Sequence, residues 1–460
     1  MIGNIALIIL CNFLFYLKTF QFKYVSDDIQ SAMRTPEKNP FVHYFWVIEG
    51  KLKSVSYNMM KKGVANFHLP FVDHLITTLI HSLVCAGIYV GFGANNVSLL
   101  AAFLFSFNPI NNQGAVWISG RGYALSALGM VWALAVPWEM GWLSLLVATY
   151  SNAGFFMPVA LLGSGHPQLL IFMPFIWALY FKNFRKNVKQ KYEMETFEDD
   201  RKLEPFKIIL ATKTFGFYIV HSLIPIKNTF YHSFLESLAG SKKWRARKMD
   251  RFFFCGVIAI ALMAWYLITH KWDTVSFAIL WWCVGIGPFL NIMRMQQEIS
   301  ERYCYLPNVG LMVILATILS KVFVLSPMVY GVLVGGFVMM YATKMWFYME
   351  TFKDDFWLIE YATMWSPDSW FAWNARAHTR MNSQSFKEAQ IFWVIALNIS
   401  PKEFKILLNI AGSLLLMGPQ YHAEGLGYVA EAEKNIPEGQ EKQCKDLIAN
   451  FRKGQVTFLV

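Results

Sequence analysis

The chain has 460 residues, of which 55% are hydrophobic, 17% aromatic and only 15% charged. Soluble globular proteins carry about 25% charged residues, so this composition is too apolar for a protein surrounded by water. It excludes a cytosolic enzyme, a secreted disulfide scaffold and a disordered binding protein. The composition instead predicts a polytopic membrane protein.

The net charge is +11, from 41 Lys and Arg against 30 Asp and Glu. The basic residues cluster beside apolar stretches, where they can meet anionic headgroups and set the orientation of the spans. The charge therefore predicts contact with membrane lipids and no nucleic-acid partner. The six cysteines are scattered without CxxC spacing, so they are assigned no disulfide framework and no metal site.

Apolar stretches recur through the first 348 residues, and several are long enough to cross a bilayer core of about 30 Å. Residues 1–17 predict a membrane helix, because the stretch lacks the basic start and the cleavage site of a signal peptide. Further spans are predicted at 69–91, 97–112, 120–136, 138–163, 167–182, 206–225, 252–270, 273–293, 304–322 and 325–348. The predicted fold class is all-α, and domain 1–348 is a helix bundle of about 11 spans with a long outer loop at 18–68.

The predicted orientation starts from residues 182–192, which carry five basic residues and no acidic one. The positive-inside rule places this segment in the cytoplasm. The loops at 18–68, 111–119, 226–250 and 294–303 and the C-terminal region then face outward, into the periplasm, the extracellular space or the endoplasmic-reticulum lumen. The basic segment 242–251 would then lie on the outer side, against the rule. It could be an interfacial helix that contacts headgroups, or it could attract a phosphorylated lipid.

A 34-residue period begins after Met349. Pro367 and Pro401 lie 34 residues apart, and Pro437 closes the next frame two residues late. Each of two successive frames has alanine at three corresponding positions: Ala377, Ala389 and Ala396, then Ala411, Ala423 and Ala430. Small residues at these positions let two helices pack closely, and proline ends the second helix. Residues 349–460 are therefore predicted to form a tetratricopeptide-type α-solenoid of about two to three helix pairs.

Two adjacent carboxylates, Asp27 and Asp28, follow the first predicted helix. Such a pair could supply a general base, or could help to hold a cation or a sugar. The plainer alternative is a helix N-cap, since aspartate caps helices well.

His74 and His81 lie seven residues apart in one predicted span. Seven residues make about two helical turns, so the two rings do not converge on one metal ion. Polar groups inside a span usually face the protein interior, which favours a helix-packing role for both.

Charged residues also stand at the mouths of two predicted spans. Arg121 needs an anionic partner there, and Asp27, Asp28 or a lipid phosphate would serve. The neighbours Glu301 and Arg302 could neutralise other charges within the fold, or Arg302 could bind a phosphate with two parallel hydrogen bonds. Tyr303 and Tyr305 either support that site or belong to an interfacial aromatic belt.

Together these motifs resemble the transmembrane-and-tetratricopeptide-repeat glycosyltransferases, a family that includes O-mannosyltransferases and belongs to the class with the GT-C membrane fold. The similar stretches are Asp27–Asp28, His74–His81, Asn108–Arg121 and Glu301–Pro307. The last stretch is the closest match, and it precedes the repeats as in that family. The resemblance covers both the membrane region and the repeats.

The chain also departs from the family pattern. Gln113 stands where the family usually has a glutamate, and Asn108 stands where it often has a histidine. Residues 151–153 read Ser-Asn-Ala in place of Ser-Lys-Glu, and the family's arginine-proline motif is not evident around residues 54–63.

The resemblance implies inverting transfer of one mannose-like sugar from a polyprenyl phosphate to a hydroxyl, with a protein as the expected acceptor. One of Asp27 and Asp28 would be the base, and Arg302, with Arg121 or Lys227, would bind the leaving phosphate. The supporting residues would be His74, His81, Asn108, Gln113, Glu301, Tyr303 and Tyr305. The repeats would hold the polypeptide acceptor. No metal ligands are assigned, and a divalent cation is left open as a cofactor.

Two other functions stay open at this stage. The neutral residues at charged family positions also fit a catalytically silent relative that acts as a membrane scaffold through its repeats. A transporter of lipid-linked sugars is a third hypothesis, which predicts polar groups spread along the bilayer midplane.

Overall fold

The computed structural model describes residues 1–28, 69–137, 140–141, 143–145, 157–164, 167–172, 174, 205–232, 249–292, 299–436 and 441–459. Within these ranges the fold is helical and contains no β-strand. Most of the predicted outer loop, the basic segments 182–192 and 242–248, and Pro437 lie outside the described residues.

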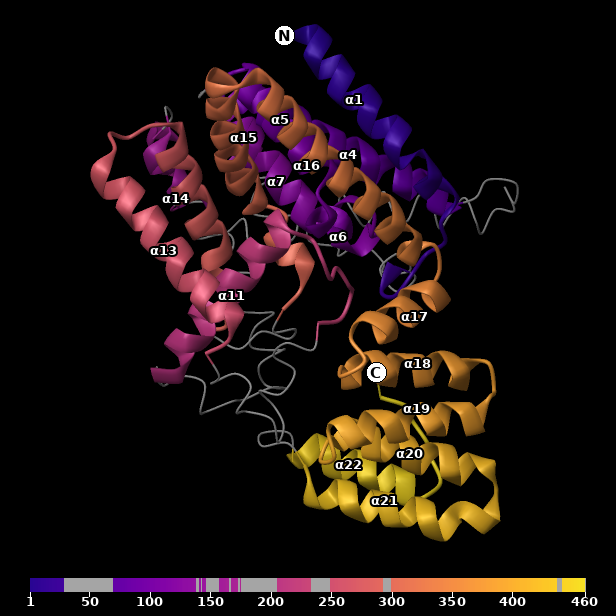
Figure 1. Cartoon of the computed structure of the whole chain (residues 1–460). Coiled ribbons are helices and arrows are strands. Elements are labelled where there is room, and N and C mark those ends of the chain that lie inside the picture. The colour runs from indigo at the N-terminus through magenta and orange to yellow at the C-terminus, as the bar shows by residue number, and fades with distance from the viewer. Residues whose placement is uncertain are drawn as a thin grey trace.

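The described residues up to Phe352 form a helix bundle (Figure 1). Its α-helices are α1 (Ile2–Tyr16), α4 (Leu69–Gly91), α5 (Asn96–Phe107), α6 (Asn112–Ala115), α7 (Arg121–Ala135), α11 (Pro205–Leu223), α13 (Arg251–Thr269), α14 (Thr274–Ile286), α15 (Asn308–Leu325) and α16 (Pro327–Met349). Short 3₁₀ helices lie between or beside them: η1 (Leu17–Gln21), η2 (Pro109–Asn111), η3 (Ile118–Gly120), η4 (Met157–Gly163), η5 (Pro167–Phe172), η8 (Gly287–Phe289), η9 (Glu301–Cys304) and η10 (Glu350–Phe352).

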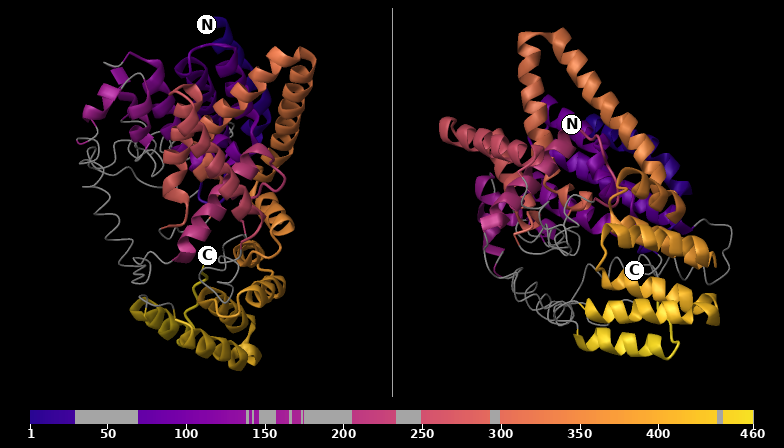
Figure 2. Two further views of the ribbon diagram at one scale, coloured as in Figure 1. Left: turned by 60° about the vertical axis from the view of Figure 1, so that its left-hand side comes forward. Right: turned by 60° about the horizontal axis from the view of Figure 1, so that its bottom comes forward.

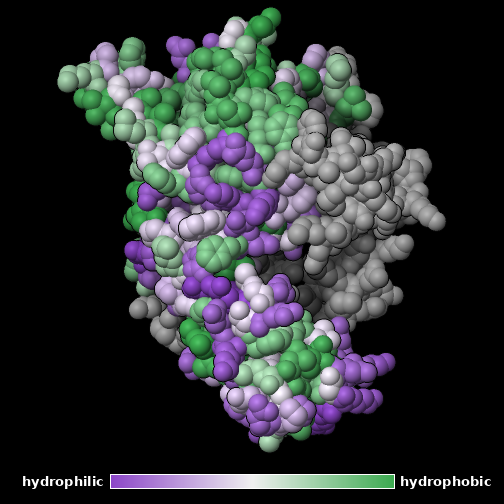
Figure 3. Space-filling view, turned by 90° about the vertical axis from the view of Figure 1, so that its right-hand side faces the viewer, coloured by the Kyte–Doolittle hydropathy of each residue, from purple (hydrophilic) through white to green (hydrophobic). Residues whose placement is uncertain are grey.

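Five helical stretches of the described chain are long and apolar enough to cross a membrane. They are Ile2–Gln21, Pro70–Gly91, Arg251–Thr269, Asn308–Leu325 and Pro327–Phe352. Nine of the predicted spans coincide with helices, but several of those helices are too short to meet this criterion. Figure 3 shows apolar side chains gathered at one end of this face, more polar side chains over the middle and a mixture of both at the opposite end.

The predicted span 97–112 is wrong at its C-terminal end, because α5 stops at Phe107. Asn108 has an extended backbone there, and its side-chain oxygen accepts a hydrogen bond from the main-chain N–H of Ile110. Pro109 has no N–H to continue the helical pattern, and it is well suited to the first turn of a new helix. The chain therefore bends into η2 and α6.

Glycines allow close contact between several bundle helices. A Cβ atom on Gly216 of α11 would lie 2.0 Å from the carbonyl oxygen of Phe252, and one on Gly256 of α13 would lie 2.1 Å from that of Thr212. A Cβ atom on Gly310 of α15 would lie 2.4 Å from the carbonyl oxygen of Ala278 in α14. The backbones at these crossings are too close for any side chain.

The C-terminal region is a stack of antiparallel helices beyond one end of the bundle (Figures 1 and 2). It comprises α17 (Asp355–Trp365), α18 (Trp370–Asn382), α19 (Phe386–Ile399), α20 (Phe404–Met417), η11 (Pro419–Tyr421), α21 (His422–Lys434) and α22 (Glu441–Arg452). Two tightly packed pairs, α18 with α19 and α20 with α21, follow one another in the stack.

Four of the six alanines of the 34-residue period lie in helix interfaces, as predicted. Ala377, Ala389, Ala396 and Ala411 are fully buried, but Ala423 and Ala430 are exposed. Their places in the interface are taken two residues later, by Gly425 and Ala432. The reason is a longer turn at Gly418, where φ is +134°, so that α21 begins 36 residues after α19 (422 − 386) instead of 34.

Candidate functional site

The acidic turn, residues 24–28, lies beside the short segment 117–121 that leads into α7. Asp28 is buried, and its Oδ1 accepts hydrogen bonds from the main-chain N–H (2.8 Å) and the hydroxyl (2.6 Å) of Ser119. Its Oδ2 accepts a hydrogen bond from the N–H of Val25 at 3.1 Å. The side chain of Asp27 is exposed next to it. The turn therefore fixes one carboxylate and presents the other to solvent.

Arg121 pairs with Asp73 and not, as was one expectation, with Asp27 or Asp28. The guanidinium Nη2 lies 3.1 Å from Asp73 Oδ1, and both side chains are almost completely buried. Nη2 also donates to the carbonyl oxygen of Asp73, and Nε donates to the hydroxyl of Thr77 at 3.1 Å. Arg121 is thereby bound to the first turns of α4, which reduces what it can offer to an external phosphate.

Tyr24, in the acidic turn, forms a hydrogen bond with this ion pair. Its hydroxyl donates to Asp73 Oδ2 at 2.8 Å. Burial and the negative charge of Asp73 raise the pKa of Tyr24 well above its ordinary value, so the hydroxyl stays protonated as a donor. The contact joins the acidic turn to α4 and, through Arg121, to α7.

The acidic turn also contacts the start of the helical stack. The N–H of Ser26, a residue with φ of +54°, donates to the carboxylate of Asp355 at 2.6 Å. The N–H of Lys23 donates to the carbonyl oxygen of Lys353 at 2.9 Å. Burial raises the pKa of Asp355. The turn thus lies where the bundle meets the stack.

Arg302 approaches the same segment from η9. Its guanidinium carbon lies 5.3 Å from the centroid of the Trp117 ring and 5.4 Å from that of Tyr303. Within the described chain no carboxylate forms an ion pair with Arg302. The Trp117 indole in turn donates to the carbonyl oxygen of Val25 at 3.4 Å. Segment 117–121 therefore connects the acidic turn with Arg302.

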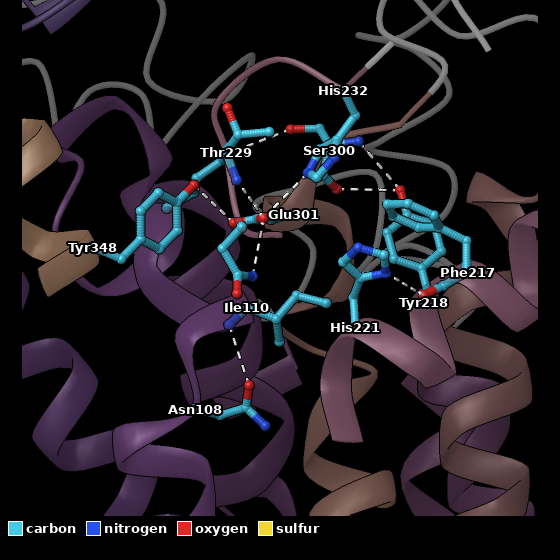
Figure 4. Close-up of polar contacts among 12 residues, drawn as sticks. Asn108, Ile110, Phe217, Tyr218, His221, Thr229, His232, Ser300, Glu301 and Tyr348 are labelled. Carbon is cyan, nitrogen blue, oxygen red and sulfur yellow. Dashed lines mark hydrogen bonds and ion pairs between the residues drawn. The ribbon is translucent and has the colours of Figure 1, made fainter. Parts of the chain in front are cut away.

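Glu301 is fully buried and makes four hydrogen bonds with the protein (Figure 4). Its Oε1 accepts from Asn228 Nδ2 (3.0 Å), the N–H of Thr229 (3.0 Å) and His232 Nε2 (3.1 Å), and its Oε2 accepts from the hydroxyl of Tyr348 (2.9 Å). Glu301 therefore holds its carboxylate within the fold, and the expected neutralisation of other charges stays a prediction. It joins η9 to residues 228–232 and to α16.

The two histidines of α4 lie in the protein interior. His81 contacts the hydroxyls of Tyr305 (2.5 Å) and Tyr16 (3.3 Å) and the carbonyl oxygen of Ser106 (3.2 Å). The ring of His74 packs edge-on against Phe22, with 6.1 Å between ring centroids. These contacts agree with the expected helix-packing role.

The remaining predicted residues are divided between buried contacts and the surface. Asn108 donates to the carbonyl oxygen of Ser222, Gln113 accepts from the hydroxyl of Ser300, and Tyr303 stacks on Phe289 at 4.4 Å. Lys227 is exposed. The structure thus brings Asp28, with exposed Asp27 beside it, and Arg302 to segment 117–121, which ends at Arg121. Asn108, Tyr305 and the histidines hold the bundle together.

Sequence reasoning missed Asp73, Tyr24, Trp117 and Ser119. A signal existed for Asp73, since a carboxylate inside an apolar helix is costly and is usually paired. Trp117 and Ser119 gave no such signal, because only the fold brings them to Arg302 and Asp28.

The described residues contain no group of three or more His, Cys, Asp or Glu side chains that could hold a metal ion. No protein-family model, curated protein or solved structure matches this chain.

Proposed function

We propose that this protein is a membrane glycosyltransferase that moves one mannose-like sugar from a polyprenyl phosphate to a hydroxyl, with a protein as the acceptor. The observation that carries the proposal is that segment 117–121 contacts both the acidic turn, where Asp27 is exposed beside Asp28, and the guanidinium of Arg302, which forms no ion pair with a carboxylate of the described residues. Sugar transfer from a lipid phosphate needs these two groups: a base for the acceptor and a cation for the leaving phosphate.

Asp27 is the better candidate for the base. Its carboxylate is exposed and can meet an incoming hydroxyl, whereas three hydrogen-bond donors already occupy Asp28. Asp27 takes the hydroxyl proton as the acceptor oxygen attacks the anomeric carbon. The bond from that carbon to the phosphate oxygen breaks, and the polyprenyl phosphate leaves with the electron pair. Asp28 positions the turn by holding Ser119.

Arg302 is the candidate that binds the leaving phosphate. Its guanidinium lies against the rings of Trp117 and Tyr303 and forms no ion pair with a carboxylate of the described chain, so it can bind an oxyanion. Arg121 supports the segment from behind through its pair with Asp73, and exposed Lys227 can add a second positive charge. A fixed arginine can neutralise this leaving group without a divalent cation.

The architecture supports this proposal in outline. A donor carried on a membrane lipid requires a protein within the bilayer, which the apolar helices provide. We propose a GT-C-like bundle of about 11 spans, with the acidic turn and a tetratricopeptide-type stack on the extracytoplasmic side. The contact of Ser26 with Asp355 places the turn next to the stack, where a bound polypeptide would be close to the base.

The test uses the full chain, purified and supplied with polyprenyl-phosphate mannose or glucose and a mixture of peptides rich in serine and threonine. Asp27→Asn should lower the transfer rate by about 10²- to 10⁴-fold. Lys271→Gln, exposed between α13 and α14 and outside the stack, is the control and should leave the rate unchanged. Equal rates for wild type and Asp27→Asn would refute the assigned base.

A membrane scaffold is the second candidate function, and a specific observation favours it. Glu301 makes four hydrogen bonds within the fold, and Asp73 pairs with Arg121 there, so these charges serve its architecture. A scaffold predicts that no donor is turned over and that Asp27→Asn changes nothing, while substitutions on the helical stack abolish partner binding. The same set of variants separates the two functions.

A further inference from the structure

The segment that follows α22 returns to the helical stack and lies along it. The chain turns at Gly454, where φ is +77°, and residues 455–459 continue without helical structure. In Figure 1 this segment is the yellow trace that runs back across the orange helices of the stack. Its main-chain contacts with α18 and α20 are made by one face of these helices, which we call the α18–α20 face and define by Asn374, His378, Asn409 and Gly412.

The α18–α20 face binds the main chain of this segment. The Asn409 amide nitrogen donates to the carbonyl oxygen of Leu459 at 2.7 Å, and its Oδ1 accepts from the N–H of Leu459 at 2.7 Å. His378 Nε2 lies 2.8 Å from the same carbonyl oxygen. Any polypeptide can offer an N–H and a carbonyl in this arrangement, so these contacts do not depend on the identity of residue 459.

A second buried amide belongs to the same arrangement. Asn374 lies 35 residues before Asn409 (409 − 374), at a neighbouring position of the preceding helix pair, and its oxygen accepts from the Asn409 amide at 3.0 Å and from the Trp393 indole at 2.9 Å. Both asparagines are almost completely buried. Buried amides are costly when their partners are removed, so this face favours an occupant that offers main-chain polar groups.

Side-chain contacts add a preference for an aromatic residue. The ring of Phe458 stacks on Trp393 with 5.5 Å between centroids and 6° between planes. Gly412 gives the segment room, because a Cβ atom there would lie 2.6 Å from a methyl group of Val456 and 3.1 Å from the Phe458 ring. An extended stretch with an aromatic residue just before the bound main-chain group fits these contacts.

The segment lies at the surface, where it packs against the apolar clusters of the stack without being enclosed by them. Val456, Phe458 and Leu459 are only partly buried, and Gln455 and Thr457 are exposed. Its partial exposure leaves the segment open to replacement by a competing chain. A tethered segment acts at an effective concentration of order millimolar, so a free peptide of equal intrinsic affinity binds more weakly while the segment is present.

We infer that the α18–α20 face is a binding site for an extended polypeptide with an aromatic residue followed by an aliphatic one, and that residues 455–459 fill this site in cis and compete with the partner. The inference concerns binding alone and holds whether or not the chain transfers sugar.

The test measures binding of a fluorescent peptide, Ala-Ser-Gln-Phe-Leu-Ser-Ala, to the purified full chain without any sugar donor. A chain that ends at Lys453 should bind it at least about tenfold more tightly than the intact chain, because the competing segment is gone. Asn409→Leu in the shortened chain should reverse this gain. A peptide with alanine for phenylalanine, or with an N-methylated leucine that lacks the N–H, should bind at least about tenfold more weakly.

Equal affinity of the shortened and intact chains would overturn the inference, as would equal binding of the control peptides. The shortened chain could instead unfold and refold only when a peptide of residues 454–460 is added. The segment would then be part of the fold, and the inference would fail. Leu459→Pro in the intact-length chain removes a single N–H donor, so it tests the same competition without shortening the chain. This variant should also bind the peptide more tightly than wild type.

Discussion

The membrane bundle and the helical stack bury polar groups in different ways. The bundle buries charges: Asp73 with Arg121, and Glu301 with four donors. The stack buries mainly neutral groups, such as Asn374 and Asn409, and packs through alanine and glycine. Removing one partner of a buried charge costs far more than removing one of a neutral pair. The difference indicates that the bundle depends on a few buried charged side chains held in fixed positions. The stack depends on close helix packing and leaves its surface free to vary.

The largest effect is expected for the buried ion pair of the bundle. Asp73→Asn leaves the Arg121 guanidinium buried without its counter-charge, which should lower the free energy of unfolding by about 3–5 kcal/mol. Thermal unfolding in detergent measures this loss. Restoring stability with the double variant Asp73→Asn and Arg121→Met would confirm that the unpaired charge is the cause, whereas a stable single variant would contradict the pair.

Glu301→Gln should lower the free energy of unfolding by less, about 2–3 kcal/mol. The side chain keeps its shape and one acceptor oxygen, but its new amide N–H₂ faces existing donors. Tyr348→Phe removes only one of the four donors and is the matched milder change. The ratio of the two losses, measured in the same unfolding assay, tests whether Glu301 joins η9 to α16. Equal, negligible losses would mean that it does not.

In the stack, Asn409→Leu should lower the free energy of unfolding by about 1–2 kcal/mol, since neutral hydrogen bonds to Asn374 and Leu459 are lost. Protease resistance of residues 355–459 reports this region separately from the bundle. A loss as large as that of Asp73→Asn would break the contrast between the two regions.

The pH dependence of the stack should come from His378. Burial, followed by the nearby Lys405, lowers the pKa of this histidine from its ordinary 6.5. Below about pH 6.5 the unfolded chain therefore binds the proton more readily than the folded chain, and stability should fall as the pH decreases. His378→Gln keeps a donor toward Leu459 and should flatten the profile between pH 7 and 5. An unchanged profile in this variant would assign the dependence to another group.

The smallest effect on stability is expected at the exposed acidic turn. Asp27→Asn should change the free energy of unfolding by no more than about 0.5 kcal/mol, because its carboxylate is open to solvent. Asp28→Asn is the comparison, since it disturbs the bonds with Ser119. Unfolding curves of both variants show whether a loss of transfer in Asp27→Asn reflects chemistry. A stability loss as large as that of Asp28→Asn would assign Asp27 a structural role.

The sequence by itself determined the helices and their apolar character. Apolar stretches and breaks such as Asn108–Pro109 act over a few residues, so the positions of most bundle helices could be read within a short margin. The alanine period likewise predicted the buried Ala377, Ala389, Ala396 and Ala411. It failed at Ala423 and Ala430, because a turn that is two residues longer shifts the phase of the following helix.

Only the tertiary structure decided which polar groups meet. Arg121 lies 48 residues from Asp73, Ser119 lies 91 from Asp28, and Leu459 lies 50 from Asn409, and no local pattern encodes such pairs. Each charge needed a partner by its burial, which the sequence indicates, but which partner it finds depends on how whole helices pack. The sequence therefore indicated which charged residues need a partner, and the packing of the helices decided which residues are in contact.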